Sequence, residues 1–227
     1  MKQAYILPVA IILAGVIVAL AVFVVRGGGS DVPVEADITA LRPVSPEEHL
    51  IGNPTAPVIL IEYSDIDCAY CKQMQRTMTQ IMLDYGATGK VAWVYRHFPV
   101  VQNHPHAGTH AEASECVTSL AGKDAFWRFI DLMQTNAPGT AEFNPNDYPA
   151  LLSQLGIDQG AFDSCLNNGT FVKRVEADLA NGLAIGATVT PYSVIVIKGA
   201  EPIPVSGAVP YAAMKEIIEE ALSRVVE

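Results

Sequence analysis

The chain has 227 residues, half of them hydrophobic, and its 24 acidic residues outnumber its 14 lysines and arginines to give a net charge of −10. So much apolar material can bury a large core, which excludes a natively disordered chain. The acidic surface argues against nucleic acid and anionic lipid as partners. About 200 residues follow an apolar N-terminus, a length that suits one domain with an inserted part.

The chain opens with a predicted membrane segment. Residues 4–25 contain no charged residue, and about 20 apolar residues are enough for a helix to cross a bilayer. Lys2 precedes this run, so the positive-inside rule places the N-terminus in the cytoplasm and the remaining chain outside it. The alternative is a cleaved signal peptide, because Ala19-Leu20-Ala21 has the small-x-small form of a cleavage site. The apolar run continues past that site, so we expect residues 1–26 to be an uncleaved transmembrane anchor.

A flexible tether is expected next, at residues 27–53, which begin with Gly-Gly-Gly-Ser and contain three prolines. The folded domain is expected at residues 54–227. It starts with a β-branched apolar run at 58–63, which is typical of a buried strand. Apolar residues then recur at helical spacing from Met74 to Tyr85, and residues 91–95 predict a second strand.

The rest of the chain is predicted to be helical up to about residue 185 and mixed after it. Strands are expected at 192–197 and 203–205, and Pro210 begins a terminal helix. Helices are expected at 111–120, 126–133, 148–155, 159–166 and 171–183. A central sheet with helices on both faces would bury all of these apolar stripes, so the fold class is α/β.

Cys68 and Cys71 form a C-x-x-C motif between a predicted strand and a predicted helix. Unpaired N–H groups and the helix dipole favour a thiolate at a helix N-terminus, so we expect a lowered pKa for Cys68. Cys71 lies one turn later on the same face, close enough for a disulfide. A zinc site would need a second ligand pair, and covalent haem would need His in place of Lys72. A plain structural disulfide stays possible, although so small a loop would stabilise the fold little.

The active-site segment resembles that of DsbA-like thioredoxin-fold oxidoreductases. The similarity covers roughly residues 48–224 and rests on segments that occur in the same order: Gly52-Asn53-Pro54, Glu62 to Lys72, Arg96-His97-Phe98-Pro99, His104-Pro105 and Thr190-Pro191. C-x-x-C alone is a weak signal, but with these companions it is specific. The resemblance implies a thioredoxin-like fold with an inserted helical subdomain at about 103–186, preceded here by one transmembrane helix.

The resemblance also implies a role for each site residue. Cys68 would be the exposed nucleophile and Cys71 the thiol that resolves the mixed disulfide with a client. Glu62 would lie beneath the disulfide and take a proton from Cys71, although a partly exposed structural role for Glu62 stays open. Thr190-Pro191 matches the family's cis-proline, whose preceding backbone pairs with a client strand.

The two residues inside the motif, Ala69 and Tyr70, are expected to contact the client. Here the chain departs from the family, since members often have Pro at position 69 and strong oxidants often have His at position 70. Tyr70 cannot stabilise a thiolate by charge, so a milder oxidant is expected.

Cys116 and Cys165 stand alone in the helical part of the chain. We favour a structural disulfide between them, worth roughly 4 kcal/mol for a loop of about 50 residues, with two buried free thiols as the alternative. The histidines at 97, 104, 106 and 110 lack metal-site spacing and indicate a surface or loop cluster. We therefore expect no metal and no cofactor.

Three functions are compatible with these residues. The first is an extracytoplasmic oxidase that donates the Cys68–Cys71 disulfide to exported proteins and is reoxidised by a membrane redox partner. The second is a reductase or isomerase supplied by a membrane electron donor. The third is a chaperone module that grips unfolded chains without catalysis. Cysteine pairs of this kind suit a periplasmic or other oxidising compartment.

Overall fold

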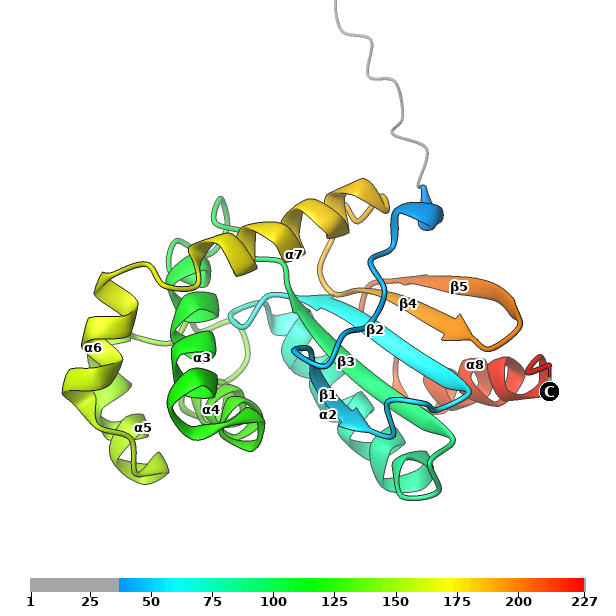
Figure 1. Cartoon of the computed structure of the whole chain (residues 1–227), viewed down its shortest axis with the longest axis horizontal. Coiled ribbons are helices and arrows are strands. Elements are labelled where there is room, and N and C mark those ends of the chain that lie inside the picture. The colour runs from blue at the N-terminus through cyan, green and yellow to red at the C-terminus, as the bar shows by residue number, and fades with distance from the viewer. Residues whose placement is uncertain (1–36, 227) are drawn as a thin grey trace, which may run out of the picture. The chain divides into compact units, whose positions relative to one another are not determined.

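The computed structural model describes residues 37–226 (Figure 1). The predicted transmembrane anchor at 1–26 and the start of the predicted tether lie outside the described residues. Within residues 37–226, every helix is too short or too polar to cross a bilayer. The described part contains one sheet, helices on both of its faces, and a helical insertion.

The sheet has five strands in the order β1-β3-β2-β4-β5. Strands β2 and β3 are parallel, and all other neighbours are antiparallel. The strands are β1 (His49–Gly52), β2 (Val58–Ser64), β3 (Val91–His97), β4 (Tyr192–Ile197) and β5 (Ala200–Ser206). Strand β2 runs through the centre, so its C-terminal end lies in the middle of the sheet, just before the C-x-x-C motif.

Side chains alternate across the sheet and so bury two separate cores. One core joins the sheet to α2 (Ala69–Ile81) and α8 (Tyr211–Ser223) and includes Leu60 of β2 and Trp93 of β3. The other core lies on the opposite face, against α7 (Val172–Ala184), and includes Ile61 and Tyr63. Glu62 has the parity of Leu60, so its side chain points to the face that carries α2.

The insertion between β3 and β4 forms a third apolar cluster of its own. It consists of α3 (Ala107–Ala121), α4 (Lys123–Asn136), η3 (Pro145–Asp147), α5 (Tyr148–Leu155), α6 (Gln159–Asn167) and α7, which returns across the sheet (Figure 1). A disulfide between Cys116 of α3 and Cys165 of α6 closes it, which is the pairing favoured from the sequence. The fold is the expected α/β arrangement with a helical insertion.

Two elements depart from the expected pattern. The predicted tether at 27–53 is too long, because η1 (Ile38–Ala40) and β1 belong to the folded domain, with β1 paired along β3. The Met74–Tyr85 helix also changes at η2 (Met82–Gly86), one turn of π-helix. Strand β1 is short and lies in a polar, proline-containing stretch. Its residues show no strand pattern of their own, and the strand forms because it pairs with β3.

A buried carboxylate joins this first strand to the insertion. Oε1 of Glu115, on α3, lies 2.7 Å from His49 Nε2, 3.1 Å from His97 Nε2 and 2.5 Å from Arg174 Nε. These partners come from β1, β3 and α7. Burial alone would raise the pKa of Glu115, but the hydrogen bonds from His49 and His97 hold it well below 4.5. One carboxylate therefore connects the sheet to two helices of the insertion.

Replacing Glu115 should destabilise the domain. In Glu115→Ala the buried histidines and Arg174 lose their common partner, which should lower the free energy of unfolding by about 3–5 kcal/mol in urea titrations at pH 7. Because the folded pKa is depressed, this stabilisation is complete above about pH 4.5 and is lost as the pH falls through the folded value.

The matched control is Glu112→Ala on the same helix, since Glu112 is only partly buried and lacks these partners. Equal losses of stability in the two variants would contradict the role assigned to Glu115.

Candidate active site

Cys68 lies at the junction of β2 and α2, as the N-cap residue of the helix, with extended backbone angles of φ −64° and ψ 123°. Cys71 follows within the first turn, and both residues are free thiols. Cys68 is 8% exposed and Cys71 1% exposed. The expectation of an exposed nucleophile was too strong, because Cys68 is a buried residue that lines a pocket.

The two sulfurs have opposite ionisation preferences. The hydrogen bond from the Cys71 thiol does most to lower the pKa of Cys68, to about 5 from an ordinary 9.0; burial opposes this, while hydrogen bonding with Thr190 and the backbone N–H groups of Cys71 and Tyr70 adds to it. Burial raises the pKa of Cys71 well above 9.0, and the adjacent Cys68 thiolate raises it further. At neutral pH the pair therefore holds one thiolate and one thiol, as disulfide exchange requires.

Glu62 lies in the β2 face beneath α2 and is 1% exposed. Its Oε1 accepts a hydrogen bond from Ser64 Oγ at 2.8 Å, and its Oε2 accepts one from Trp93 Nε1 at 3.0 Å. Burial raises its pKa to about 7, more than these two hydrogen bonds lower it. The negative charge of Glu62 in turn raises the pKa of Cys71. A carboxyl group that titrates near neutrality is thus coupled to the resolving thiol, and the partly exposed alternative is wrong.

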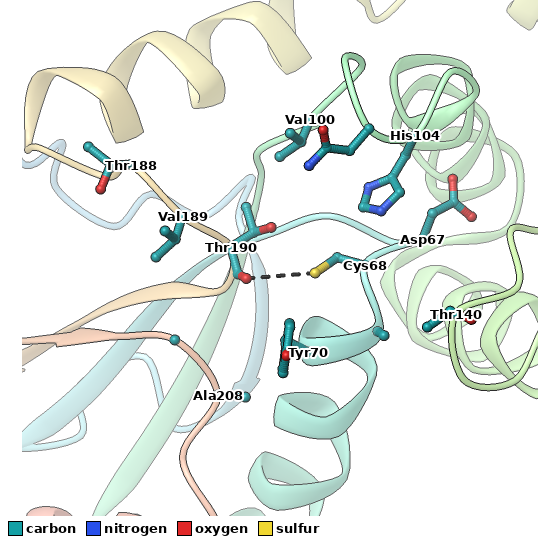
Figure 2. Close-up of a pocket in the computed structure, with 13 residues that line it drawn as sticks. Asp67, Cys68, Tyr70, Val100, His104, Thr140, Thr188, Val189, Thr190 and Ala208 are labelled. Carbon is teal, nitrogen blue, oxygen red and sulfur yellow. Dashed lines mark hydrogen bonds between the residues drawn. The ribbon is translucent and has the colours of Figure 1, made fainter.

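The Thr190-Pro191 peptide bond is cis and directly precedes β4. Cys68 Sγ lies 3.6 Å from the Thr190 carbonyl oxygen, the contact drawn as a dashed line in Figure 2. The structure thus brings together Cys68 and Thr190, 122 residues apart in the chain. The cis-proline loop lies beside the nucleophile, where the resemblance placed it.

A pocket of about 600 Å³ opens over Cys68 (Figure 2). Ala69 and Tyr70 line it on the helix side, and Thr190 lines it on the opposite side. The Tyr70 side chain is 63% exposed and Val189 is 46% exposed. An exposed aromatic and an exposed aliphatic residue therefore lie beside the Cys68 sulfur at the rim of the pocket.

Two charged residues beside the motif tie the insertion to the site. Lys72 Nζ donates to the carbonyl oxygens of Ala137 and Ala141, each at 2.6 Å, and Asp67 Oδ1 accepts from Phe143 N at 3.2 Å. Both side chains are buried. They hold the segment after α4, whose Thr140 lines the pocket. Sequence reasoning missed this role, and the only local signal was a charged residue on each side of the two cysteines.

The histidines separate into different environments. His104 lines the pocket, His106 is exposed, and His110 is buried with Nδ1 2.5 Å from the Tyr148 hydroxyl. The cluster expected from the sequence therefore does not exist as one group.

Among the described residues, His49, His97 and Glu115 come closest to a metal-binding arrangement, with one ligand atom from each within 4.8 Å of the others. The Glu115 oxygen in this group also accepts from Arg174. A guanidinium at that oxygen competes with a metal cation, so the cluster is explained as an ion-pair network.

The thioredoxin family profile, described simply as "Thioredoxin", matches residues 44–220. Among solved structures, DsbA2 of Pseudomonas aeruginosa has a TM-score of 0.68 at 23% identity, covering 81% of this chain and 100% of its own. BdbD of Bacillus subtilis, in its oxidised form, has a TM-score of 0.68 at 24% identity, covering 81% and 97%. Alpha-DsbA1 T172V of Wolbachia pipientis has the same score at 21% identity, covering 82% and 96%. At these identities the likeness establishes the fold.

Curated relatives match over a shorter stretch. The Na(+)/H(+) antiporter NhaA of Herminiimonas arsenicoxydans is 33% identical over 150 residues, which is 66% of this chain and 22% of that protein. NhaA 3 of Salinispora tropica is 32% identical over 146 residues, 64% of this chain and 21% of that protein. The chain therefore spans about a fifth of the length of these relatives.

Substitutions at Cys71 should test the hydrogen bond to Cys68. Cys71→Ala removes the donor that does most to lower the Cys68 pKa, so that pKa should rise above about 5. Cys71→Ser keeps a hydroxyl donor and should keep most of the lowering. The measurement is the pH dependence of iodoacetamide alkylation of Cys68, because only the thiolate reacts. Identical midpoints in the two variants would argue against this hydrogen bond.

Glu62→Gln should slow the attack of Cys71 on a mixed disulfide. The amide cannot accept the Cys71 proton, so displacement of glutathione from Cys68 should slow on the order of 10²-fold at neutral pH. In the unsubstituted chain the same rate should increase as the pH rises through about 7, where Glu62 loses its proton.

Glu201→Gln serves as the control, since Glu201 is an exposed acid of β5 in the same sheet. A Glu62→Gln rate that keeps the original pH dependence would remove Glu62 from the proton transfer.

Proposed function

Since this chain belongs to the thioredoxin family and holds a C-x-x-C dithiol beside a cis-proline, it is a thiol–disulfide oxidoreductase, and we propose that it oxidises cysteines of exported proteins. The single observation that carries the proposal is the position of Cys68, a free thiol at the N-terminus of α2 whose Sγ lies 3.6 Å from the carbonyl oxygen of the cis Thr190-Pro191 bond.

The proposed reaction transfers two electrons from the client to the enzyme. A client thiolate attacks Cys68 Sγ in the Cys68–Cys71 disulfide; a client–Cys68 bond forms, and Cys71 leaves and takes a proton from Glu62. A second client thiolate then attacks the client sulfur of the mixed disulfide, which forms the client disulfide and releases Cys68 as a thiolate. The client is oxidised, and the enzyme disulfide is reduced to the dithiol.

The Cys68 pKa supports the oxidising direction. A folded pKa of about 5 lies below the ordinary 9.0, so ionisation of Cys68 stabilises the reduced enzyme. This stabilisation is complete above pH 9 and is lost as the pH falls through about 5, so much of it is present at neutral pH. An enzyme whose reduced form is stabilised gives its disulfide away readily.

The substrate is proposed to bind as an extended segment across the cis-proline loop. The Thr190 carbonyl already lies beside Cys68, and Tyr70 and Val189 offer exposed apolar surface on either side of the sulfur. Backbone pairing next to the reactive sulfur would give affinity for many unfolded clients with little demand on their sequence.

The compartment and the redox partner are also proposals. The charge-free run at residues 4–25 supports a single-pass anchor with the catalytic domain on the extracytoplasmic side. The Cys116–Cys165 disulfide supports an oxidising compartment. After each turnover the dithiol needs an electron acceptor, and a membrane redox partner is the proposed one.

The redox equilibrium of the Cys68–Cys71 pair with glutathione tests the direction. We expect a potential clearly above the roughly −270 mV of thioredoxin, because the Cys68 thiolate is stabilised. A value as reducing as that of thioredoxin would favour the reductase alternative.

Trapping of clients tests the reaction itself. Cys71→Ala in cells should accumulate mixed disulfides through Cys68, and Cys68→Ser should trap none. If Cys68→Ser left client maturation intact, a non-catalytic chaperone role would replace the oxidase.

A further inference from the structure

His104 and Asp65 form a dyad at the Cys68 pocket that the exchange reaction above does not use. His104 Nδ1 lies 2.9 Å from Asp65 Oδ2, and the same oxygen accepts from Val100 N at 2.8 Å. Asp65 Oδ1 accepts from Asp67 N at 2.9 Å. Asp65 is 1% exposed. A buried carboxylate therefore fixes both the imidazole ring and the loop that carries it.

The orientation of the ring follows from this contact. With Nδ1 against Asp65, the Nε2 atom is the ring nitrogen left for the pocket. His104 and Cys68 both line that pocket. Figure 2 shows the His104 ring between Asp67 and Thr190, on the side of the Cys68 sulfur.

His104 is the only basic side chain among the residues that line the pocket. Lys72, four residues after Cys68, also interacts electrostatically with the Cys68 thiolate, but its ammonium group lies outside the pocket lining and is hydrogen-bonded to the carbonyl oxygens of Ala137 and Ala141. Burial lowers the pKa of His110 to about 4, so that ring is neutral at pH 7. His106 is exposed and lies outside the pocket lining.

We propose that His104, positioned by Asp65, provides the positive charge that stabilises the Cys68 thiolate, a charge that Tyr70 inside the motif cannot supply. The proposal rests on the proposed function and adds a charge-stabilising residue to it. It also explains how a chain without histidine in its C-x-x-C can hold an ionised sulfur in a pocket of mostly uncharged residues.

The charges around His104 support this assignment. Partial burial opposes its protonation, but the hydrogen bond to Asp65 and the negative charges of Asp65, Cys68 and Asp67 outweigh it and raise the pKa of His104 above 6.5. The ion pair between His104 and Cys68 forms above about pH 5, where Cys68 becomes a thiolate. It is lost at a pH above 6.5, where the His104 imidazolium gives up its proton. The stabilisation is lost on both sides of this window.

Proton balance follows from the same pairing. Oxidation of two client thiols releases two electrons, which reduce the Cys68–Cys71 disulfide, and two protons. One proton ends on Cys71, by way of Glu62, and Cys68 stays a thiolate. The new thiolate raises the pKa of His104, so the second proton binds His104 at a pH between its pKa in the oxidised enzyme and its pKa in the reduced enzyme. Where His104 is already protonated in the oxidised enzyme, the second proton is released to solvent.

The first experiment measures the pKa of Cys68 by iodoacetamide alkylation in the purified full-length chain. His104→Gln should raise this pKa by about one unit, the lower end of the effect of a neighbouring opposite charge. His106→Gln, two residues away and exposed, should leave it unchanged. An unchanged Cys68 pKa in His104→Gln would overturn the proposal, because loss of a merely structural contact would affect stability and not this titration.

The second experiment leaves His104 intact. The His104 imidazole is titrated by NMR in the reduced chain and in Cys68→Ser, with an expected fall in the His104 pKa of about one unit when the thiolate is absent. Equal values in the two proteins would overturn the proposal even if His104→Gln failed to fold.

The outcomes separate this proposal from the proposed function. If Cys71→Ala trapped no clients, the oxidoreductase reaction in cells would fail whatever the titrations gave. If clients were trapped but the Cys68 pKa did not depend on His104, only the dyad would fail.

Discussion

The chemistry of this protein depends on the unequal environments of two neighbouring sulfurs. Cys68 lies at the N-terminus of α2, and Cys71 lies one turn later and is almost fully buried. Burial raises the pKa of Cys71 and so keeps it protonated. The Cys71 thiol in turn lowers the pKa of Cys68 and so favours its ionised form. The strand-to-helix junction, the buried Glu62 and the cis-proline loop all serve this arrangement.

The scaffold fixes that geometry from several sides. The central position of β2 brings its C-terminal end against both neighbours, and the helical insertion is bonded to the residues that flank the motif, Asp67 and Lys72. The insertion is therefore part of the active site as well as a cover for it. Elsewhere in the same insertion, Glu115 connects α3 to β1, β3 and α7, so the insertion is bonded both to the residues beside the motif and to the sheet.

Local signals were enough to predict much of this fold. The β-branched runs of β2 and β4 predict buried strands, and the apolar stripe of α2 predicts a buried helix face. The C-x-x-C motif by itself predicts thiol–disulfide chemistry. Strand β1 could not be predicted because its stability comes from pairing with β3 and from Glu115, 66 residues away from His49. The contacts of Lys72 with Ala137 and Ala141 were hidden for the same reason. The exposure of Cys68 was overestimated, because the residues that surround it in the pocket come from segments far apart in the sequence.

The Cys116–Cys165 bridge means that the chain must choose the correct pairs among four cysteines while it folds. Four thiols emerge in order, yet one pair must remain locked for the life of the molecule while the other must open and close with every turnover. Burial of Cys71, which is almost complete in the folded chain, would keep it from pairing with Cys116 or Cys165. The burial that keeps the second sulfur protonated in the folded enzyme would thus also favour correct pairing of the four cysteines.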